Sequence, residues 1–573
     1  MGRDDRPQLP GAVNARPRRS CLALVNGVVY PAPERPATEA ILVSDGRVEA
    51  IGTTSEIVSI APPATARVDL GGRTVLPAIT DSHTHYHRAA QLEAHFLDFT
   101  ALAPKSVGDV TRLVGDRRAS QPGEAWIQGD NLSAAALRER RLPTRLELDA
   151  VCVDRPVILR TVGKHGIAAN TAALAAASIT ADTEDPRGGR IERDASGVPT
   201  GVLHETAKLR LDATRADTVV PQIDERRRLD ALEAGIGRLS RAGIAEIHEI
   251  VQSPDEMADY ERLREQGRLN ARVVFYVRVV EGQATLADLT RIGLRSGFGD
   301  DWLRLGGVKV SIDGSCTLRN AAIYGGYLDD PDNDGLVRVE PGDLNDLVAK
   351  ATRGGLQVAV HAIGQRAVDM ALDAFQASAS ASASAGAPAG APAAVATSRD
   401  LRHRIEHAYL APLPGQLERI RDLRLVVSTQ PAFLYANGDT WPAMFGAADT
   451  DRMVPMASLL EAGIAVQINT DFPNAALDPI ANMRAAVERR TAAGAVVGAS
   501  EAVTVAQAWA LATAGSAFGA FEEDRRGRLD PGFLADIVVV NDDPIASGSL
   551  DGIQVEATIV EGEVMWASTG GCI

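Results

Sequence analysis

The sequence predicts an α/β protein whose main body is a distorted TIM-type (β/α)8 barrel, with a small β-sandwich domain built from both chain ends. Three observations support this fold class. The chain has 573 residues, about twice the size of a common single domain. Short β-branched runs separated by turn residues occupy both ends. Between them, short apolar runs alternate with helical stretches, which is the pattern of a parallel sheet.

The composition limits the classes of partner. The formal net charge is −16 and the pI is about 5.2, so the chain offers no basic field for nucleic acid or for an anionic membrane. Apolar runs stay short of the roughly 20 residues of a membrane-spanning helix, and the first residues lack the apolar segment of a signal peptide. The four cysteines have no C-x-x-C spacing. We therefore expect a cytoplasmic protein that binds a small molecule, as a monomer or a homodimer.

The two ends of the chain are expected to fold together. Residues 1–20 are polar and are predicted to be disordered. Residues 21–75 contain β-like runs broken by Asn-Gly and Asp-Gly pairs, which favour hairpins. Residues 521–573 contain the β-branched runs 535–540 and 557–566. Because each part alone is too small to bury a sheet face, we predict that 21–75 and 521–573 form one composite β-sandwich.

Residues 76–520 carry the pattern of the barrel, with predicted helices at 225–241 and 503–514. The first strand is predicted to end at His83-Thr84-His85, and later ones are Val157–Leu159, Ala245–Ile250, Val273–Val279, Val308–Ile312, Val358–His361, Arg404–His407, Leu425–Ser428 and Ile464–Ile468. A barrel of this type needs about 250 residues, so insertions are required. We predict a lid or pocket wall at about 90–230, with a hairpin turn at 194–197, and a disordered Ala/Ser-rich surface loop at 377–398.

Histidines and one acid stand at the ends of several predicted strands. His83 and His85 are two residues apart, so their side chains leave the strand on the same face. His361, His407 and Asp471 each end an apolar strand of their own, and such ends converge on one face of a βα barrel. Neutral imidazoles with a carboxylate bind first-row divalent metals, most often zinc. The alternative is that these residues are satisfied separately in turns, which five matching positions disfavour.

The motifs VLPAITDSHTH, VAVHAIG, RIEHA and NTD, with the closing GRLDPGFLADIVVV, resemble those of the amidohydrolase superfamily. More narrowly, GVKVSIDGS, KHGIAANTAAL, DASGVPTGVLHE and HRIEHA resemble the subgroup that contains N-substituted formamide deformylase and exoenzyme regulatory proteins. The likeness runs from about residue 21 to residue 566. It implies a metal site formed by His83 and His85 on the first strand, His361 on the fifth, His407 on the sixth and Asp471 on the eighth.

The resemblance also singles out Lys309 in the strand Gly307–Val310. Relatives with a similar lysine carboxylate it with CO2, and the carbamate bridges two metal ions. The alternative is an ordinary interior lysine paired with an acid such as Asp313, because a buried lysine needs a partner or a lowered pKa. The sequence is compatible with one bound metal ion and with two.

The chemistry expected at such a site follows from charge. A bound divalent ion lowers the pKa of its water towards roughly 7 and polarises a substrate carbonyl. Asp471 would take the proton from that water and pass it to the leaving nitrogen. The resemblance points to His165 in the insertion as a further donor to the developing oxyanion. The alternative for His165 is an exposed loop histidine.

We therefore expect a metal-dependent amidohydrolase that cleaves a non-peptide C–N bond, in an amide or N-substituted formamide of a small molecule. Three alternatives remain: hydrolysis of a cyclic amide, cyclic amidine or ester at the same site, a metal-dependent isomerase or decarboxylase, and a non-catalytic regulatory protein. Gln365 and Thr470 differ from residues common in the relatives, and so does the loop at 316–319. We therefore do not infer a deformylase substrate for this chain from the resemblance.

Overall fold

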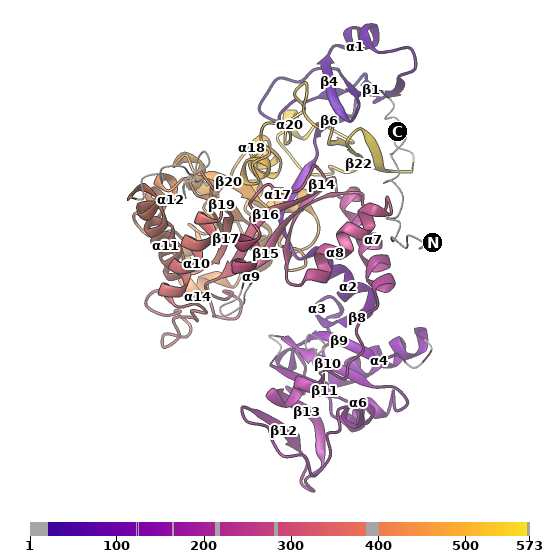
Figure 1. Cartoon of the computed structure of the whole chain (residues 1–573), viewed down its shortest axis with the longest axis vertical. Coiled ribbons are helices and arrows are strands. Elements are labelled where there is room, and N and C mark those ends of the chain that lie inside the picture. Colours follow the sequence, from indigo (N-terminus) through magenta and orange to yellow (C-terminus); the bar gives the residue numbers. More distant parts are fainter. Residues whose placement is uncertain are drawn as a thin grey trace, which may run out of the picture. The chain divides into compact units, whose positions relative to one another are not determined.

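The computed structural model describes residues 21–121, 123, 125–162, 165–211, 218–279, 285–384 and 400–569 (Figure 1). Two compact units share the chain: one takes in the residues up to Tyr86 and from Gly235 onward, and the other is His87–Ala234. The chain passes between them within helices α2 (Tyr86–His95) and α7 (Glu225–Arg241). The predicted disordered segment 1–20 lies outside the described residues.

The first unit contains the predicted barrel, formed by one eight-stranded parallel sheet. Its strands are β7 (Ile79–Thr84), β14 (Ile244–Val251), β15 (Arg272–Arg278), β16 (Leu303–Ser311), β17 (Gln357–Ala362), β18 (Arg404–His407), β19 (Val426–Thr429) and β20 (Ala465–Ile468). The first and last strands meet where the amide of Asp471 donates to the His83 carbonyl at 3.1 Å and the amide of His85 donates to the Phe472 carbonyl at 2.8 Å. The sheet is thus nearly closed, and the predicted fold class is confirmed.

Helices follow the barrel strands. They are α8 (Pro254–Glu265), α9 (Thr285–Arg291), α10 (Pro341–Arg353), α11 (Gln365–Ser384), α12 (Gln416–Asp422), α13 (Ala432–Asn437), α14 (Trp441–Phe445), α15 (Ala447–Thr450), α16 (Met456–Glu461), α17 (Pro479–Glu488), α18 (Val505–Ala512) and α19 (Ala514–Gly519). In α10, buried Leu344, Val348 and Ala351 recur at the helical period, so one face packs inward. Within the described parts of the chain, none of the helices has both the length and the apolar character that crossing a bilayer requires.

Both chain ends build the β-sandwich of this unit. One sheet holds β1 (Leu22–Val25), β3 (Ala40–Ser44), β4 (Arg47–Gly52) and β5 (Ala66–Asp69), and the other holds β2 (Val28–Val29), β6 (Thr74–Pro77), β21 (Ile537–Val540), β22 (Val555–Val560) and β23 (Glu563–Ala567). Val75 of β6 pairs with Val539 of β21, so the two ends share a sheet. Leu24, Ile41 and Ile559 meet in one buried cluster between the sheets. Two short helices, α1 (Thr54–Ile60) and α20 (Pro544–Ser547), complete the domain.

The predicted first barrel strand is two strands in the structure. The apolar sequence first forms β6, which ends at Pro77 and belongs to the sandwich. It then forms β7, which starts at Ile79 and belongs to the barrel. One continuous apolar run therefore serves two sheets. The predicted barrel strand Val157–Leu159 also needs correction: it forms β10 (Val157–Thr161), which belongs to the sheet of the second unit. The apolar pattern indicates a buried strand, but it does not say which sheet the strand joins.

The second unit, His87–Ala234, is built on a six-stranded mixed sheet with its own buried core. Its elements are β8 (Phe96–Asp98), α3 (Phe99–Leu102), α4 (Val107–Ser120), β9 (Ile127–Leu132), α5 (Arg145–Asp149), β10, β11 (Gly166–Ala169), α6 (Thr171–Ala176), β12 (Gly189–Arg193) and β13 (Pro199–Glu205). The predicted hairpin turn at 194–197 joins β12 to β13, and the Gly197 amide donates to the Asp194 carbonyl at 3.0 Å. The insertion is thus a folded unit, and its role as a lid stays a prediction.

The first part of the predicted Ala/Ser-rich loop is helical. Helix α11 continues to Ser384, whereas 385–398 lies outside the described residues. The prediction that 377–384 is a loop is wrong because alanine has the highest helix propensity, and small side chains pack where two helices approach closely. Ser378 is buried, and its hydroxyl donates to the Thr352 hydroxyl of α10 at 3.0 Å.

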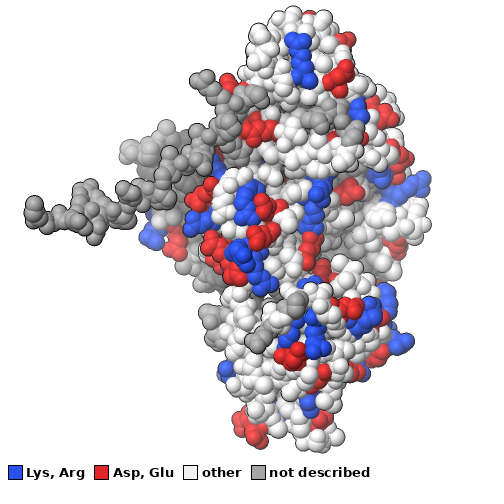
Figure 2. All heavy atoms as spheres, turned by 90° about the vertical axis from the view of Figure 1, so that its right-hand side faces the viewer, with Lys and Arg blue, Asp and Glu red and all other residues white. Residues whose placement is uncertain are grey.

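Opposite charges are interspersed on the described surface in Figure 2, where blue and red groups lie next to one another. The structure also contains exposed pairs within one helix, such as Arg112 with Asp116 at 3.3 Å and Arg262 with Glu265 at 2.9 Å. Such exposed pairs contribute little to stability. The face in view therefore carries no continuous basic surface among its described residues.

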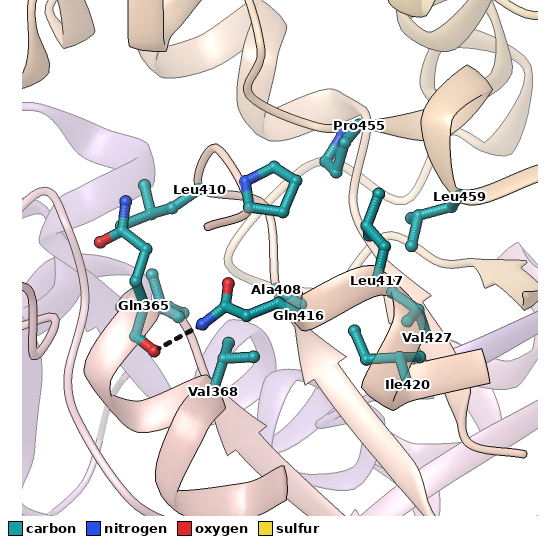
Figure 3. Close-up of a pocket in the computed structure, with 12 residues that line it drawn as sticks. Gln365, Val368, Ala408, Leu410, Gln416, Leu417, Ile420, Val427, Pro455 and Leu459 are labelled. Carbon is teal, nitrogen blue, oxygen red and sulfur yellow. Dashed lines mark hydrogen bonds between the residues drawn. The ribbon is translucent and has the colours of Figure 1, made fainter. Parts of the chain in front are cut away.

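A small apolar cavity of about 20 Å³ lies among α11, α12 and α16, beside the barrel wall (Figure 3). Val368, Ile420 and Leu459 line it, and the Gln416 amide closes one side by donating to the Gln365 carbonyl at 3.0 Å. The predicted metal ligands do not line this cavity. Its mostly apolar lining thus sets it apart from the candidate metal site.

Filling this cavity should stabilise the fold. Val368→Ile adds one methylene group beside the void, and burying a methylene is worth about 0.8 kcal/mol. We expect a small rise in the urea midpoint of unfolding. The same change at buried Val358, which does not line the cavity, should be neutral or destabilising because that site is already packed. A lower midpoint for Val368→Ile would show that the cavity walls do not accept the added group.

Candidate metal and catalytic site

Three of the predicted ligands converge at the mouth of the barrel. Nε2 of His83 lies 3.6 Å from Oδ1 of Asp471, and Nε2 of His85 lies 3.5 Å from the same oxygen. One ligand atom from each of the three residues falls within 4.8 Å of the others, so the group could hold a metal ion. Among the described residues, Oδ1 of Asp471 is buried and accepts no hydrogen bond. Two imidazole nitrogens around an orphaned carboxylate oxygen fit a divalent cation.

The local backbone explains how these side chains meet. His83 lies in β7 and His85 directly follows it, so both leave the strand end on one side. Asp471 follows β20 and has a positive φ of 53°, and His407 at the end of β18 has a φ of 78°. Non-glycine residues rarely adopt such angles, and they cluster at functional sites. These backbone angles turn the chain at the end of β18 and just after β20, where His407 and Asp471 reach the candidate site.

Asp81 fixes the loop that carries Asp471. Its carboxylate accepts the Thr470 amide at 2.9 Å and the Thr470 hydroxyl at 2.5 Å. Both residues are buried, so the contact ties β7 to the end of β20 next to Asp471. The Thr470 hydroxyl therefore holds this loop in place.

A second group of predicted ligands lies beside the first. The ring centroids of His83 and His407 are 5.2 Å apart, and those of His407 and His361 are 4.3 Å apart. Nε2 of His361 lies 3.1 Å from the Gly314 carbonyl, in position to donate to it. Nζ of Lys309 lies 3.4 Å from Nε2 of His83. The structure thus gathers all six predicted ligand residues, with His83, His85 and Asp471 forming the set whose ligand atoms already converge.

The alternative pairing of Lys309 with Asp313 is wrong. The Asp313 carboxylate instead accepts the backbone amides of Ala322, Ile363 and Gly364, at 2.9, 3.1 and 2.8 Å. The acids whose charge acts on buried Lys309 are Glu406 and Asp471. The charges that act on Lys309 thus come from residues around the candidate site, and its role as a ligand stays a prediction.

Three histidines of the site, His83, His361 and His407, favour the neutral form. Burial and the charge of Lys309 lower the pKa of His361 to about 3, and burial lowers the pKa of His83 and His407 well below the ordinary value. A neutral imidazole is the form that binds a metal. Burial raises the pKa of Asp471 and lowers the pKa of Lys309. The carboxyl and the ammonium are thus both shifted toward the range in which they exchange protons near neutral pH.

His165 lies in the second unit. It is exposed, and its Nδ1 is 2.9 Å from Oε1 of Glu205 on the neighbouring strand β13. The carboxylate accepts from Nδ1, which leaves Nε2 at the outer end of the ring. The structure therefore places His165 in a His–Glu pair, and its action on a substrate stays a prediction.

Sequence reasoning missed the residues behind the ligands. Nδ1 of His83 lies 2.5 Å from Oε2 of Glu406, and Arg404 binds that carboxylate. Nδ1 of His407 lies 2.9 Å from Oε1 of Gln430. One signal was present: Arg404 and Glu406 are two residues apart in a short barrel strand, so two opposite charges must share its interior face.

A profile of the amidohydrolase family matches residues 66–566. The chain belongs to this family. The match covers the barrel, the second unit and the sandwich from β5 onward, and it leaves out β1 to β4. The resemblance of the strand-end motifs to the amidohydrolases is thereby confirmed.

Two relatives and one solved structure show how far the likeness extends. N-substituted formamide deformylase of Arthrobacter pascens is 28% identical over 566 residues, which cover 96% of this chain and 99% of that protein. The exoenzymes regulatory protein AepA of Pectobacterium carotovorum is 30% identical over 364 residues, 62% of this chain and 76% of that protein. The crystal structure of a metal-dependent hydrolase from Pyrococcus furiosus is 26% identical with a TM-score of 0.72, and the match covers 92% of this amidohydrolase and 100% of that chain.

Proposed function

We propose that this amidohydrolase is a divalent-metal hydrolase that cleaves the C–N bond of an amide or N-substituted formamide in a small molecule, with zinc as the resident ion. The observation that carries the proposal is the convergence of two imidazole nitrogens on the orphaned oxygen of Asp471. Borderline ligands of this kind, with a carboxylate, suit zinc. A relative that acts on N-substituted formamides, alike over nearly the whole chain, supports the bond type.

His83, His85 and Asp471 would hold the ion. A divalent cation bound there would lower the pKa of a water molecule and polarise a carbonyl group. The second carboxylate oxygen of Asp471, Oδ2, accepts a hydrogen bond from the Asn474 amide at 3.1 Å. Asp471 then accepts the proton of the attacking water and delivers it to the leaving nitrogen. Its raised pKa suits both steps, because the group must first take a proton and then release it.

We further propose Lys309, His361 and His407 as the place of a second ion. Lys309 would be a ligand there as a carbamate, as the family resemblance implies. Its lowered pKa supports this, since only the neutral amine adds to CO2. Intact-mass analysis in bicarbonate buffer, with Lys309→Arg as the control, tests the carbamate as an increase of one CO2.

His165 is proposed as a donor to the developing oxyanion. The pair with Glu205 supports this role because it orients the ring. Alanine at His165 should lower kcat with little change in metal content. A loss of bound metal together with activity would place the residue among the ligands instead.

Metal removal is the direct test of this function. Treatment with a chelator should abolish hydrolysis of the best substrate in a panel of amides, N-substituted formamides, lactams and esters, read as release of amine or, for esters, of alcohol, and zinc should restore it. The panel also separates the alternatives, because an isomerase or decarboxylase gives neither free amine nor the paired carboxylate. Full activity in a chain freed of metal, verified by elemental analysis, would overturn the proposal.

A further inference from the structure

We propose that Glu406, fixed by Arg404, is a positioning residue that aims Nε2 of His83 and makes the His83–His85–Asp471 group the tighter of the two ion positions. The inference rests on the proposed function, since it concerns how the same site binds its metal. It adds to the list of ligands a difference in metal affinity between histidines that the sequence presents as equivalent.

The contact between Glu406 and His83 determines the state of the ring. Nδ1 of His83 and Oε2 of Glu406 are 2.5 Å apart, and both side chains are fully buried. An ionised carboxylate only accepts hydrogen bonds, so the proton of the neutral ring must sit on Nδ1. Nε2 is then a lone-pair donor, and it is the atom that faces Asp471. A carboxylate behind a histidine also makes that histidine a stronger ligand.

Arg404 keeps Glu406 ionised and immobile. Its Nε donates to Oε1 at 2.7 Å and its Nη2 donates to Oε2 at 3.0 Å, which is the bidentate geometry. Both side chains are buried, so the two charge-assisted hydrogen bonds pair the carboxylate with the guanidinium away from solvent. The carboxylate therefore stays charged inside the barrel.

Arg404 is itself held on every side. Nη2 donates to the Ser82 carbonyl at 2.7 Å, and Nη1 donates to Nδ1 of His248 at 3.0 Å. The guanidinium lies 4.3 Å from the centre of the Tyr276 ring, close enough for a cation–π contact. Because each of these partners is buried, they hold Arg404 in place. Its two hydrogen bonds to Glu406 hold that carboxylate in turn.

His407 has a different kind of support. Its Nδ1 donates to Oε1 of Gln430 at 2.9 Å, and the Gln430 amide donates to Oδ1 of Asn469 at 2.8 Å. Gln430 also fixes the tautomer, but it carries no charge. His83 is thus backed by an anion and His407 by a neutral amide. The difference predicts that the first ion binds at His83, His85 and Asp471.

The test is the zinc affinity of the metal-free chain, measured by competition with a chromophoric chelator. Glu406→Gln keeps an oxygen that can accept from Nδ1 but removes the charge. We expect the tighter dissociation constant to weaken about 10–100-fold, the usual effect of losing such a partner. The double variant Arg404→Met with Glu406→Gln removes both buried charges, so it keeps the test valid if the single variant folds poorly.

Asp536→Asn is the matched control, because it breaks a buried ion pair with Arg272 elsewhere in the same unit. It should lower stability and leave zinc affinity unchanged. Folded Glu406 variants that bind zinc as tightly as the wild type would overturn the inference and leave the proposed function standing. A wild-type chain that binds no zinc would instead contradict the proposed function itself.

Discussion

Asp471→Asn should reduce kcat by at least about 10³-fold while the protein stays folded. General acid–base catalysis by a positioned side chain contributes about 10²–10⁴-fold, and this carboxylate is also a proposed ligand. Asparagine tolerates the positive φ of 53° at this position and can still accept from Asn474 through its own oxygen. It cannot take a proton. The change thus removes the chemistry and spares the backbone.

The measurement is kcat for the best substrate of the panel, with circular dichroism and bound zinc determined on the same samples. Asp478→Asn is the control: Asp478 caps α17 by accepting the Ala481 amide at 2.9 Å, and asparagine caps helices equally well. This variant should keep wild-type activity. If Asp471→Asn retains kcat within threefold, the proton transfer assigned to Asp471 is wrong.

The position of the site could be predicted because barrel geometry converts sequence position into spatial position. His83, His361 and His407 stand at the ends of β7, β17 and β18, and parallel strands in register bring such ends to one rim. The backing residues could not be predicted in the same way. Glu406 meets His83 across 323 positions of sequence, and only the closure of the barrel brings β18 opposite β7.

The sequence predicted the positions of most strands and helices, but it did not predict which sheet each strand joins. The split at Ala78 and the assignment of β10 to the second unit depend on which partner strands are available, and that is a tertiary property. The Ala/Ser segment shows a second limit. Its helix at 377–384 reflects the propensity of alanine and the fit of Ser378 against Thr352, neither of which needs a large apolar side chain.

Asp536→Asn should destabilise the first unit by about 3–5 kcal/mol, the usual cost of removing one partner of a buried ion pair. Asp536 precedes β21 of the sandwich, and its carboxylate accepts from Arg272 of barrel strand β15 at 2.9 and 3.0 Å. It also accepts from Arg526 at 3.2 Å and from the Glu561 amide at 2.9 Å. Neutralising it leaves two buried guanidinium groups facing a weaker acceptor where the sandwich joins the barrel.

Urea unfolding followed by tryptophan fluorescence measures this effect, because Trp302 lies 5.0 Å from the Arg272 guanidinium and donates to Glu561 at 2.9 Å. Asp542→Asn, the same change at an exposed site near the end of β21, should alter stability by less than about 0.5 kcal/mol. Equal midpoints for the two variants would show that the ion pair contributes nothing beyond a surface charge.

The pH dependence of the Asp536 effect gives an independent check. Burial raises the pKa of this carboxyl, but the charges of Arg272 and Arg526 outweigh burial and bring it from 3.8 to about 2. A group whose pKa is lower in the folded state stabilises the fold above its unfolded pKa and loses that contribution as the pH falls toward the folded value. The stability gap between wild type and Asp536→Asn should therefore be complete above pH 5 and shrink below pH 4, by about 2 kcal/mol in all. A gap that stays constant or widens in acid would mean that Asp536 is not held as a carboxylate by its two arginines.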